Sequence, residues 1–179
     1  MRGVISFFWE VFKIVVIALA IVLPVRYFLF QPFIVKGQSM EPNFQNNNYL
    51  IVDELSYRFR DPVRGEVVIF YYPRNPKTRF IKRIIGLPGE TLEIKGGKVK
   101  INGKVLDESE YLPPGTQTIG DIRISLKKDE YFVLGDNRLF SYDSRRWGVL
   151  PRKYIIGRAI LRAWPFTIFR EIEAPGFST

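Results

Sequence analysis

The chain has 179 residues, the length of one domain with room for a small insertion. It contains no His and no Cys, so thiol chemistry is excluded and the usual zinc, copper and iron ligands are missing. We therefore expect no metal and no cofactor. The formal charge of +9 suits either nucleic acid or anionic lipid. Because the basic residues are scattered and form no basic helix or zinc-finger spacing, we expect no nucleic-acid partner.

Residues 1–30 are expected to form a retained N-terminal membrane anchor, a single transmembrane helix. Ile14 to Val25 is an unbroken apolar run, and the basic side chains of Lys13 and Arg26 at its ends can reach the interface. A cleaved signal peptide would end in a small-residue site, and none follows Ala20. A buried core helix is the other alternative. Positive charge near the start favours a cytoplasmic N-terminus, with the following residues at the outer face of the cell membrane.

Residues 31–179 are expected to form a mainly β domain, antiparallel and either a folded sheet or barrel-like. Runs of β-branched and aromatic residues closed by turn residues are typical of such strands. These runs are Tyr49 to Val52, Glu66 to Tyr72, Phe80 to Ile85, Tyr131 to Leu134 and Ile155 to Leu161. A short helix is expected only around 53–59.

An insertion around 90–130 is expected to contain a short β-meander. Gly96-Gly97 and Asn102-Gly103 separate three alternating segments, and such pairs are strong hairpin signals. Residues 107–120 are rich in Pro, Gly, Ser and Thr, which indicates a loop.

Ser39 is the candidate nucleophile. It lies in Gly37-Gln38-Ser39-Met40-Glu41-Pro42, directly after the apolar N-terminal segment. Gly37 permits a backbone shape that is closed to other residues, and the Ser39 N–H is available as an oxyanion donor. In a chain without His, the proton of a nucleophilic serine must go to another base, and lysine is the usual substitute. The alternative is an ordinary Gly/Ser/Pro turn.

Lys82 is the candidate base. On a strand it shares one face with Phe80 and Ile84, and burial between apolar neighbours lowers the pKa of an amine. A base that works near neutral pH needs a pKa of roughly 8 instead of about 10.4, a difference of about 3 kcal/mol. The alternative is a lysine on an edge strand that extends into solvent.

A third block, from Gly135 to Arg145, follows a predicted strand. Its turn formers, carboxylates and arginines suit a solvated loop with local ion pairs. The alternative assigns supporting roles, with Asp143 and Arg145 as an ion pair and Ser141 as a hydroxyl that orients the lysine.

With these three blocks in order, the chain resembles the bacterial type I signal peptidases, which are membrane-bound serine proteases. The resemblance implies a mostly antiparallel β catalytic domain outside the membrane, with Ser39 as nucleophile, Lys82 as general base and Ser141 holding Lys82. It implies exported preproteins as substrates, cut after small residues at the −1 and −3 positions, and membrane lipid as a further partner. One departure is Gly37, where some members carry a serine that donates to the oxyanion.

An extended substrate could pair with the strand leading to Ser39. By proximity, five apolar residues are expected around its small side chains: Phe33, Val35, Met40, Phe80 and Ile81. Two other functions stay open at this point. One is a LexA-like self-cleaving serine protease, and the other is a membrane-anchored β domain that binds peptide or lipid without catalysis.

Overall fold

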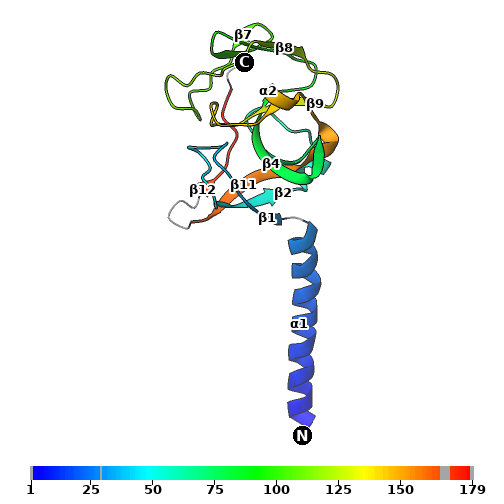
Figure 1. The fold of residues 1–179 in the computed structure, drawn as a ribbon. Coiled ribbons are helices and arrows are strands. Elements are labelled where there is room, and N and C mark those ends of the chain that lie inside the picture. The colour runs from blue at the N-terminus through cyan, green and yellow to red at the C-terminus, as the bar shows by residue number, and fades with distance from the viewer. Residues whose placement is uncertain (1, 29, 166–169, 178–179) are drawn as a thin grey trace.

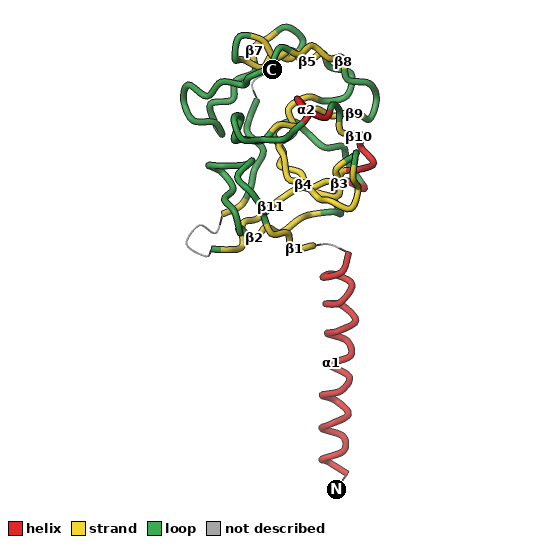
Figure 2. The backbone as a smooth tube through the Cα atoms, in the orientation of Figure 1, coloured by secondary structure: helices red, strands yellow, loops and turns green. Residues whose placement is uncertain are grey.

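The computed structural model describes residues 2–28, 30–165 and 170–177. One long helix, α1 (Arg2–Phe28), leads into a β domain made of a large sheet and a small one (Figures 1 and 2). All strand pairs are antiparallel. The expected mainly β, antiparallel domain is therefore confirmed.

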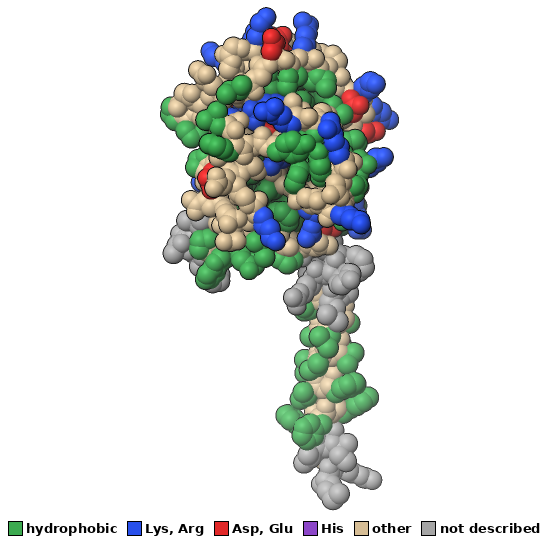
Figure 3. Space-filling model, viewed as in Figure 1, with side chains coloured by type: hydrophobic (Ala, Val, Ile, Leu, Met, Phe, Trp, Pro, Cys, Tyr) green, Lys and Arg blue, Asp and Glu red, His purple; other side chains and the backbone are tan. Residues whose placement is uncertain are grey.

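Helix α1 projects away from the β domain, and its described apolar side chains face outward (Figure 3). Phe7, Trp9 and Ile14 are each more than half exposed. Within the described ranges, however, no helix combines the length and the apolar character needed to cross a membrane. The expected transmembrane helix is therefore not confirmed. The unbroken apolar run from Ile14 to Val25 has 12 residues, whereas a bilayer core takes about 20.

The large sheet contains eight strands in the order β1-β2-β11-β3-β4-β9-β10, with β12 paired to β11. Its strands are β1 (Phe30–Ile34), β2 (Tyr49–Asp53), β3 (Val67–Tyr72), β4 (Asn75–Gly86), β9 (Glu130–Leu134), β10 (Leu150–Pro151), β11 (Ile155–Trp164) and β12 (Arg170–Glu171). Buried β-branched and aromatic residues fill β3, β9 and the second half of β4, which makes these strands the centre of the domain.

The small sheet has the order β7-β6-β5-β8. Its strands are β5 (Thr91–Lys95), β6 (Lys98–Ile101), β7 (Lys104–Val105) and β8 (Ile122–Ser125). The two predicted hairpin turns are present, and all four of their residues have positive φ, from 51° to 85°. Strand β8 was not predicted: it returns after the 107–120 loop and pairs with β5, with Leu92 opposite Ile124.

Short helical turns complete the fold. They are η1 (Ser56–Arg58), which lies within the predicted helix, η2 (Arg152–Tyr154) and α2 (Ser144–Trp147). The side chain of Asp143 caps α2 by accepting the N–H of Arg145.

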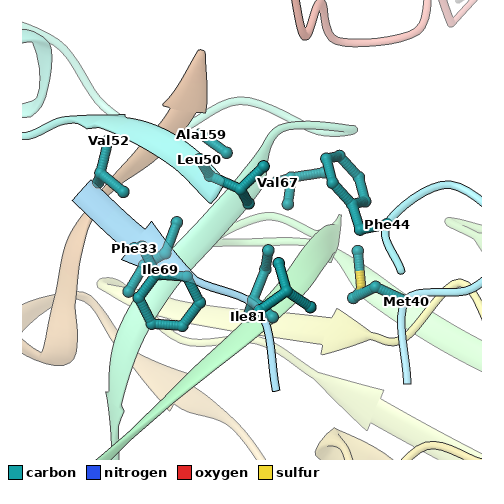
Figure 4. Close-up of a cluster of buried hydrophobic side chains, with 10 residues drawn as sticks. Phe33, Met40, Phe44, Leu50, Val52, Val67, Ile69, Ile81 and Ala159 are labelled. Carbon is teal, nitrogen blue, oxygen red and sulfur yellow. The ribbon is translucent and has the colours of Figure 1, made fainter. Parts of the chain in front are cut away.

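One buried cluster joins the N-terminal strands to β4 (Figure 4). Phe33 of β1, Ile81 of β4 and Met40, which follows Ser39, all belong to it, and Met40 has no exposed surface. The cluster therefore fixes the turn that carries Ser39 against the strand that carries Lys82. The aromatic residues at 166–169 lie outside the described residues.

Candidate active site

Ser39 lies in a turn between β1 and β2 that backbone hydrogen bonds close at its base. The Val35 N–H donates to the Asn48 carbonyl at 2.9 Å, and the Asn47 N–H donates to the Val35 carbonyl at 2.8 Å. Gly37 has φ +91°, which glycine adopts at low cost, and its N–H donates to Oδ1 of Asn46 at 3.0 Å. Ser39 itself is half-buried.

Lys82 is only 4% exposed. Its Nζ donates to Oγ of Ser39 at 2.6 Å and to the Ile81 carbonyl at 2.8 Å. Burial lowers the pKa of Lys82 to about 8, although the negative charges of Asp143 and Asp136 oppose the shift. A neutral amine is thus accessible near neutral pH, in hydrogen-bond contact with a serine hydroxyl. We call these two side chains the Ser–Lys pair.

Asp143 and Arg145 form the ion pair that the third block suggested. Nη2 of Arg145 lies 2.9 Å from Oδ2 of Asp143, and Nε donates to Oδ1 at 2.9 Å. The Gly135 N–H also donates to Oδ2, at 3.1 Å. Burial alone would raise the pKa of the Asp143 carboxyl, but Arg145 and these hydrogen bonds hold it below its ordinary value. The pair is structural, since it fixes the loop that follows β9.

The expected hydrogen bond from Ser141 to Lys82 is not present among the described residues. The Ser141 Oγ is buried, and it lies close enough to Asp143 to contribute to the lowered pKa of that carboxyl. It lies instead against Gly135, where an added Cβ would overlap both Ser141 Oγ and the Ser39 carbonyl oxygen. Gly135 is thus a point of close approach between the third block and the turn that carries the candidate nucleophile Ser39.

A second buried ion pair was not predicted from the sequence. Arg83, next to Lys82, donates from Nε and Nη2 to the carboxylate of Asp136 at 2.8 and 2.6 Å. The Arg83 guanidinium also stacks on the Tyr111 ring at 4.3 Å and donates to the Gly65 carbonyl at 2.8 Å. This bidentate contact ties β4 to the loop after β9. The sequence did indicate, through strand alternation, that Arg83 lies on the opposite face from Lys82, but it gave no sign of the partner Asp136.

The Ser–Lys pair lines a cleft of about 710 Å³ between the segment after β1 and strand β4. Three of the five apolar residues expected to contact substrate line it: Phe33, Phe80 and Ile81. Val35 and Met40 do not line it; they are almost wholly buried in the core cluster to which Phe33 and Ile81 also belong.

Sequence reasoning missed several cleft residues. Lys36, Lys77 and Arg79 place positive charge along the cleft, and Phe140 and Tyr142 of the third block form part of its wall. The hydroxyls of Tyr142 and Tyr72 lie 3.0 Å apart, which joins this loop to β3. The sequence offered little sign that these residues line a cleft, because isolated cations and aromatics are common on protein surfaces.

Residues 8–164 match the family described as "Signal peptidase, peptidase S26". A probable signal peptidase I-2 of Synechocystis sp. is 42% identical over 161 residues, which are 87% of this chain and 73% of the relative. A signal peptidase I of Leptolyngbya laminosa is 39% identical over 93% of this chain and 84% of its own length. The crystal structure of a signal peptidase I from Enterococcus faecalis V583 is 32% identical, covers 55% of this chain and 97% of its own, and has a TM-score of 0.48. By sequence, the chain belongs to the signal peptidase family, peptidase S26.

Proposed function

We propose that this protein is a serine endopeptidase that removes N-terminal signal peptides from exported preproteins, with Ser39 as nucleophile and Lys82 as general base. One observation supports it above the others: a buried lysine with a lowered pKa lies 2.6 Å from a serine Oγ in an open cleft. A serine can be activated without histidine when the base has a lowered pKa and lies within hydrogen-bond distance of the hydroxyl.

The reaction follows from this geometry. Neutral Lys82 takes the proton of Ser39 as Oγ attacks the scissile carbonyl carbon, and the oxygen becomes an oxyanion. The Ser39 N–H can donate to it. Lys82 then gives the proton to the leaving amine as the C–N bond breaks, which leaves the signal peptide as an ester on Ser39. Water attacks this ester, gives its proton to Lys82, and releases the peptide as Ser39 regains its hydrogen.

The cleft dimensions favour an extended peptide as substrate. A strand can enter between the segment after β1 and β4, where the backbone offers hydrogen bonds and the side chains Phe33, Phe80 and Ile81 offer apolar contacts. The preference for small side chains at the −1 and −3 positions is carried over from the resemblance to signal peptidases.

Helix α1 is proposed to hold this domain at the cell membrane, with the N-terminus cytoplasmic and the catalytic domain on the outer face. The support is that its described apolar side chains are exposed and point away from the β domain, where contact with lipid would cost less free energy than contact with water. Because the chain has no Cys, a single cysteine can be placed at Gly3 or Ser109 and labelled in intact cells. Labelling of Ser109→Cys alone supports this topology, and labelling of both from outside contradicts it.

Cleavage of a model preprotein with an Ala-x-Ala site tests the activity. The purified protein in detergent is compared with Ser39→Ala, Lys82→Met and the control Lys95→Met, which removes an exposed lysine of the small sheet. Wild type and control should cut at that site, whereas Ser39→Ala and Lys82→Met should be folded but inactive. Cleavage surviving in either would overturn the Ser–Lys mechanism. A folded wild type that binds the peptide without cutting it would favour the non-catalytic binding domain.

A further inference from the structure

The oxyanion donor of this site depends on the orientation of one peptide group. Ser39 lines the cleft, and its N–H makes no hydrogen bond to any described residue. Gly37, two positions earlier, carries no hydroxyl that could share the task. If a single N–H stabilises the oxyanion, the direction of that N–H has to be fixed before substrate binds.

Asn137 holds the peptide groups on both sides of Ser39. Its Nδ2 donates to the Gln38 carbonyl at 3.1 Å, and its backbone N–H donates to the Ser39 carbonyl at 3.1 Å. The Gln38 carbonyl and the Ser39 N–H belong to the same planar peptide group and point in opposite directions. The Glu41 N–H donates to the same carbonyl at 3.1 Å, so Asn137 and Glu41 together fix the direction of the Ser39 N–H, and both polarise the group so that the N–H donates more strongly.

Asn137 is itself firmly placed. Its neighbours Asp136 and Arg138 are both buried, with Asp136 paired to Arg83 and Arg138 paired to Glu108 at 2.6 Å. The Phe140 N–H donates to Oδ1 of Asn137 at 3.3 Å, which turns the amide so that its NH2 group faces Gln38. The side chain is therefore held by one hydrogen bond at each end of its amide, on a backbone that its buried neighbours fix.

We propose that Asn137 is a positioning residue that aims the Ser39 N–H at the oxyanion. This inference rests on the proposed function, since it concerns the same reaction. It assigns Asn137 no contact with substrate. Its effect belongs to the transition state, where negative charge develops on the scissile oxygen, and not to binding of the ground state.

The test compares Asn137→Ala and Asn137→Asp with wild type on the model preprotein. Alanine removes the side-chain donor to the Gln38 carbonyl and leaves only the Glu41 N–H on it, and aspartate keeps the size and the acceptor for Phe140 but cannot donate. Both keep the backbone N–H. We expect kcat to fall by about 10- to 100-fold with KM within about twofold, since loss of one oxyanion donor costs about 10²–10³. The affinity for a peptide boronate, whose oxygen occupies the oxyanion position after Ser39 Oγ bonds to boron, should fall by the same factor.

Asn102→Ala is the matched control. Asn102 also bonds a backbone group, since its side chain accepts the Thr91 N–H at 2.8 Å. It lies outside the candidate site, in the turn between β6 and β7 of the small sheet. It should lower the melting temperature without changing kcat or boronate affinity. Wild-type kcat and boronate affinity in both Asn137 variants would overturn the inference, as would a loss confined to KM or to stability. If the wild type itself fails to cleave, the proposed function fails first, so the two failures are distinguishable.

Discussion

Ser39 and Lys82 lie 43 residues apart in the chain, yet Nζ of the lysine is 2.6 Å from Oγ of the serine. The contact is held by a buried neighbour of each residue. Met40, which follows Ser39, and Ile81, which precedes Lys82, belong to the same core cluster (Figure 4). The reactive contact is therefore an edge of the hydrophobic core, where burial also lowers the pKa of Lys82.

The lowered pKa predicts the pH dependence of cleavage. With Lys82 at about 8, the neutral amine is a minor species below that pH and dominant above it. We expect kcat/KM to rise about tenfold per pH unit on the acid side and to level off above about pH 8. The profile should be recorded with a peptide that has no titrating groups between pH 6 and 9. A flat profile across pH 8 would contradict a lysine base with this pKa.

The same shift predicts that Lys82 destabilises the fold. Its pKa is 10.5 in ordinary surroundings and about 8 in the folded protein, so between these values the unfolded chain binds more protons and stability rises with pH. Below pH 8 the shifted pKa of Lys82 lowers the free energy of unfolding by its full amount, about 3 kcal/mol. Lys82→Met should therefore be more stable than wild type at pH 7, with a gain that shrinks toward pH 10.5. Denaturant unfolding at several pH values measures it.

Lys95→Met serves as the control for this measurement, because Lys95 is exposed. Its stability difference from wild type should be small and should not vary in the same pH window. A Lys82→Met protein whose stability equals wild type at every pH would mean that the amine is not desolvated.

Gly135→Ala tests the close approach between the third block and the nucleophile turn. A methyl group there would overlap the Ser39 carbonyl oxygen, which is backbone and cannot move alone. We expect the variant to fold but to lose most of its cleavage activity, because the Ser39 turn must shift away from Lys82. Gly176→Ala is a suitable comparison, since its nearest neighbour would lie at 3.8 Å. Equal activity in the two variants would show that the turn yields easily.

Local signals explain which parts of the fold were predictable. The Gly96-Gly97 and Asn102-Gly103 turns specify their hairpins within a few residues, so the sequence was sufficient there. Strand β8 was missed because its partner, β5, lies across a long loop and its side chains alternate only weakly between half-buried and exposed. Its identity is set by non-local pairing.

The site divides in the same way. The contact between Ser39 and Lys82 was predictable because the chain offers no histidine and sets a lysine among apolar strand residues. The Arg83–Asp136 contact joins residues 53 apart, and the contact of Asn137 with Gln38 joins residues 99 apart. The spacing of residues along the sequence does not indicate which residues so far apart will meet. The surroundings of Ser141 were not predictable for the same reason, because they depend on how its loop packs against Gly135.

The Arg83–Asp136 pair carries a prediction about stability. Both side chains are at most 5% exposed, so removing one leaves a buried charge without its partner. Asp136→Ala should lower the free energy of unfolding by about 3–5 kcal/mol, and Arg83→Met should act similarly. The double variant should lose less than the sum, since neither charge is then stranded. Simple additivity in the thermal unfolding of the purified proteins would indicate that the two groups do not interact.

Positive charge along the cleft predicts a preference among substrates. Lys36, Lys77 and Arg79 line it and are exposed, and no Asp or Glu is among the described residues of its wall. Their potential favours acidic side chains near the scissile bond, and salt screens the effect over about 10 Å at 0.1 M. Peptides with Glu flanking an Ala-x-Ala site should therefore show a higher kcat/KM than those with Lys at the same position, by a margin that shrinks at high salt. Lys77→Glu combined with Arg79→Glu should reverse the order, whereas the same order in both proteins would mean that the cleft charge does not act on the substrate.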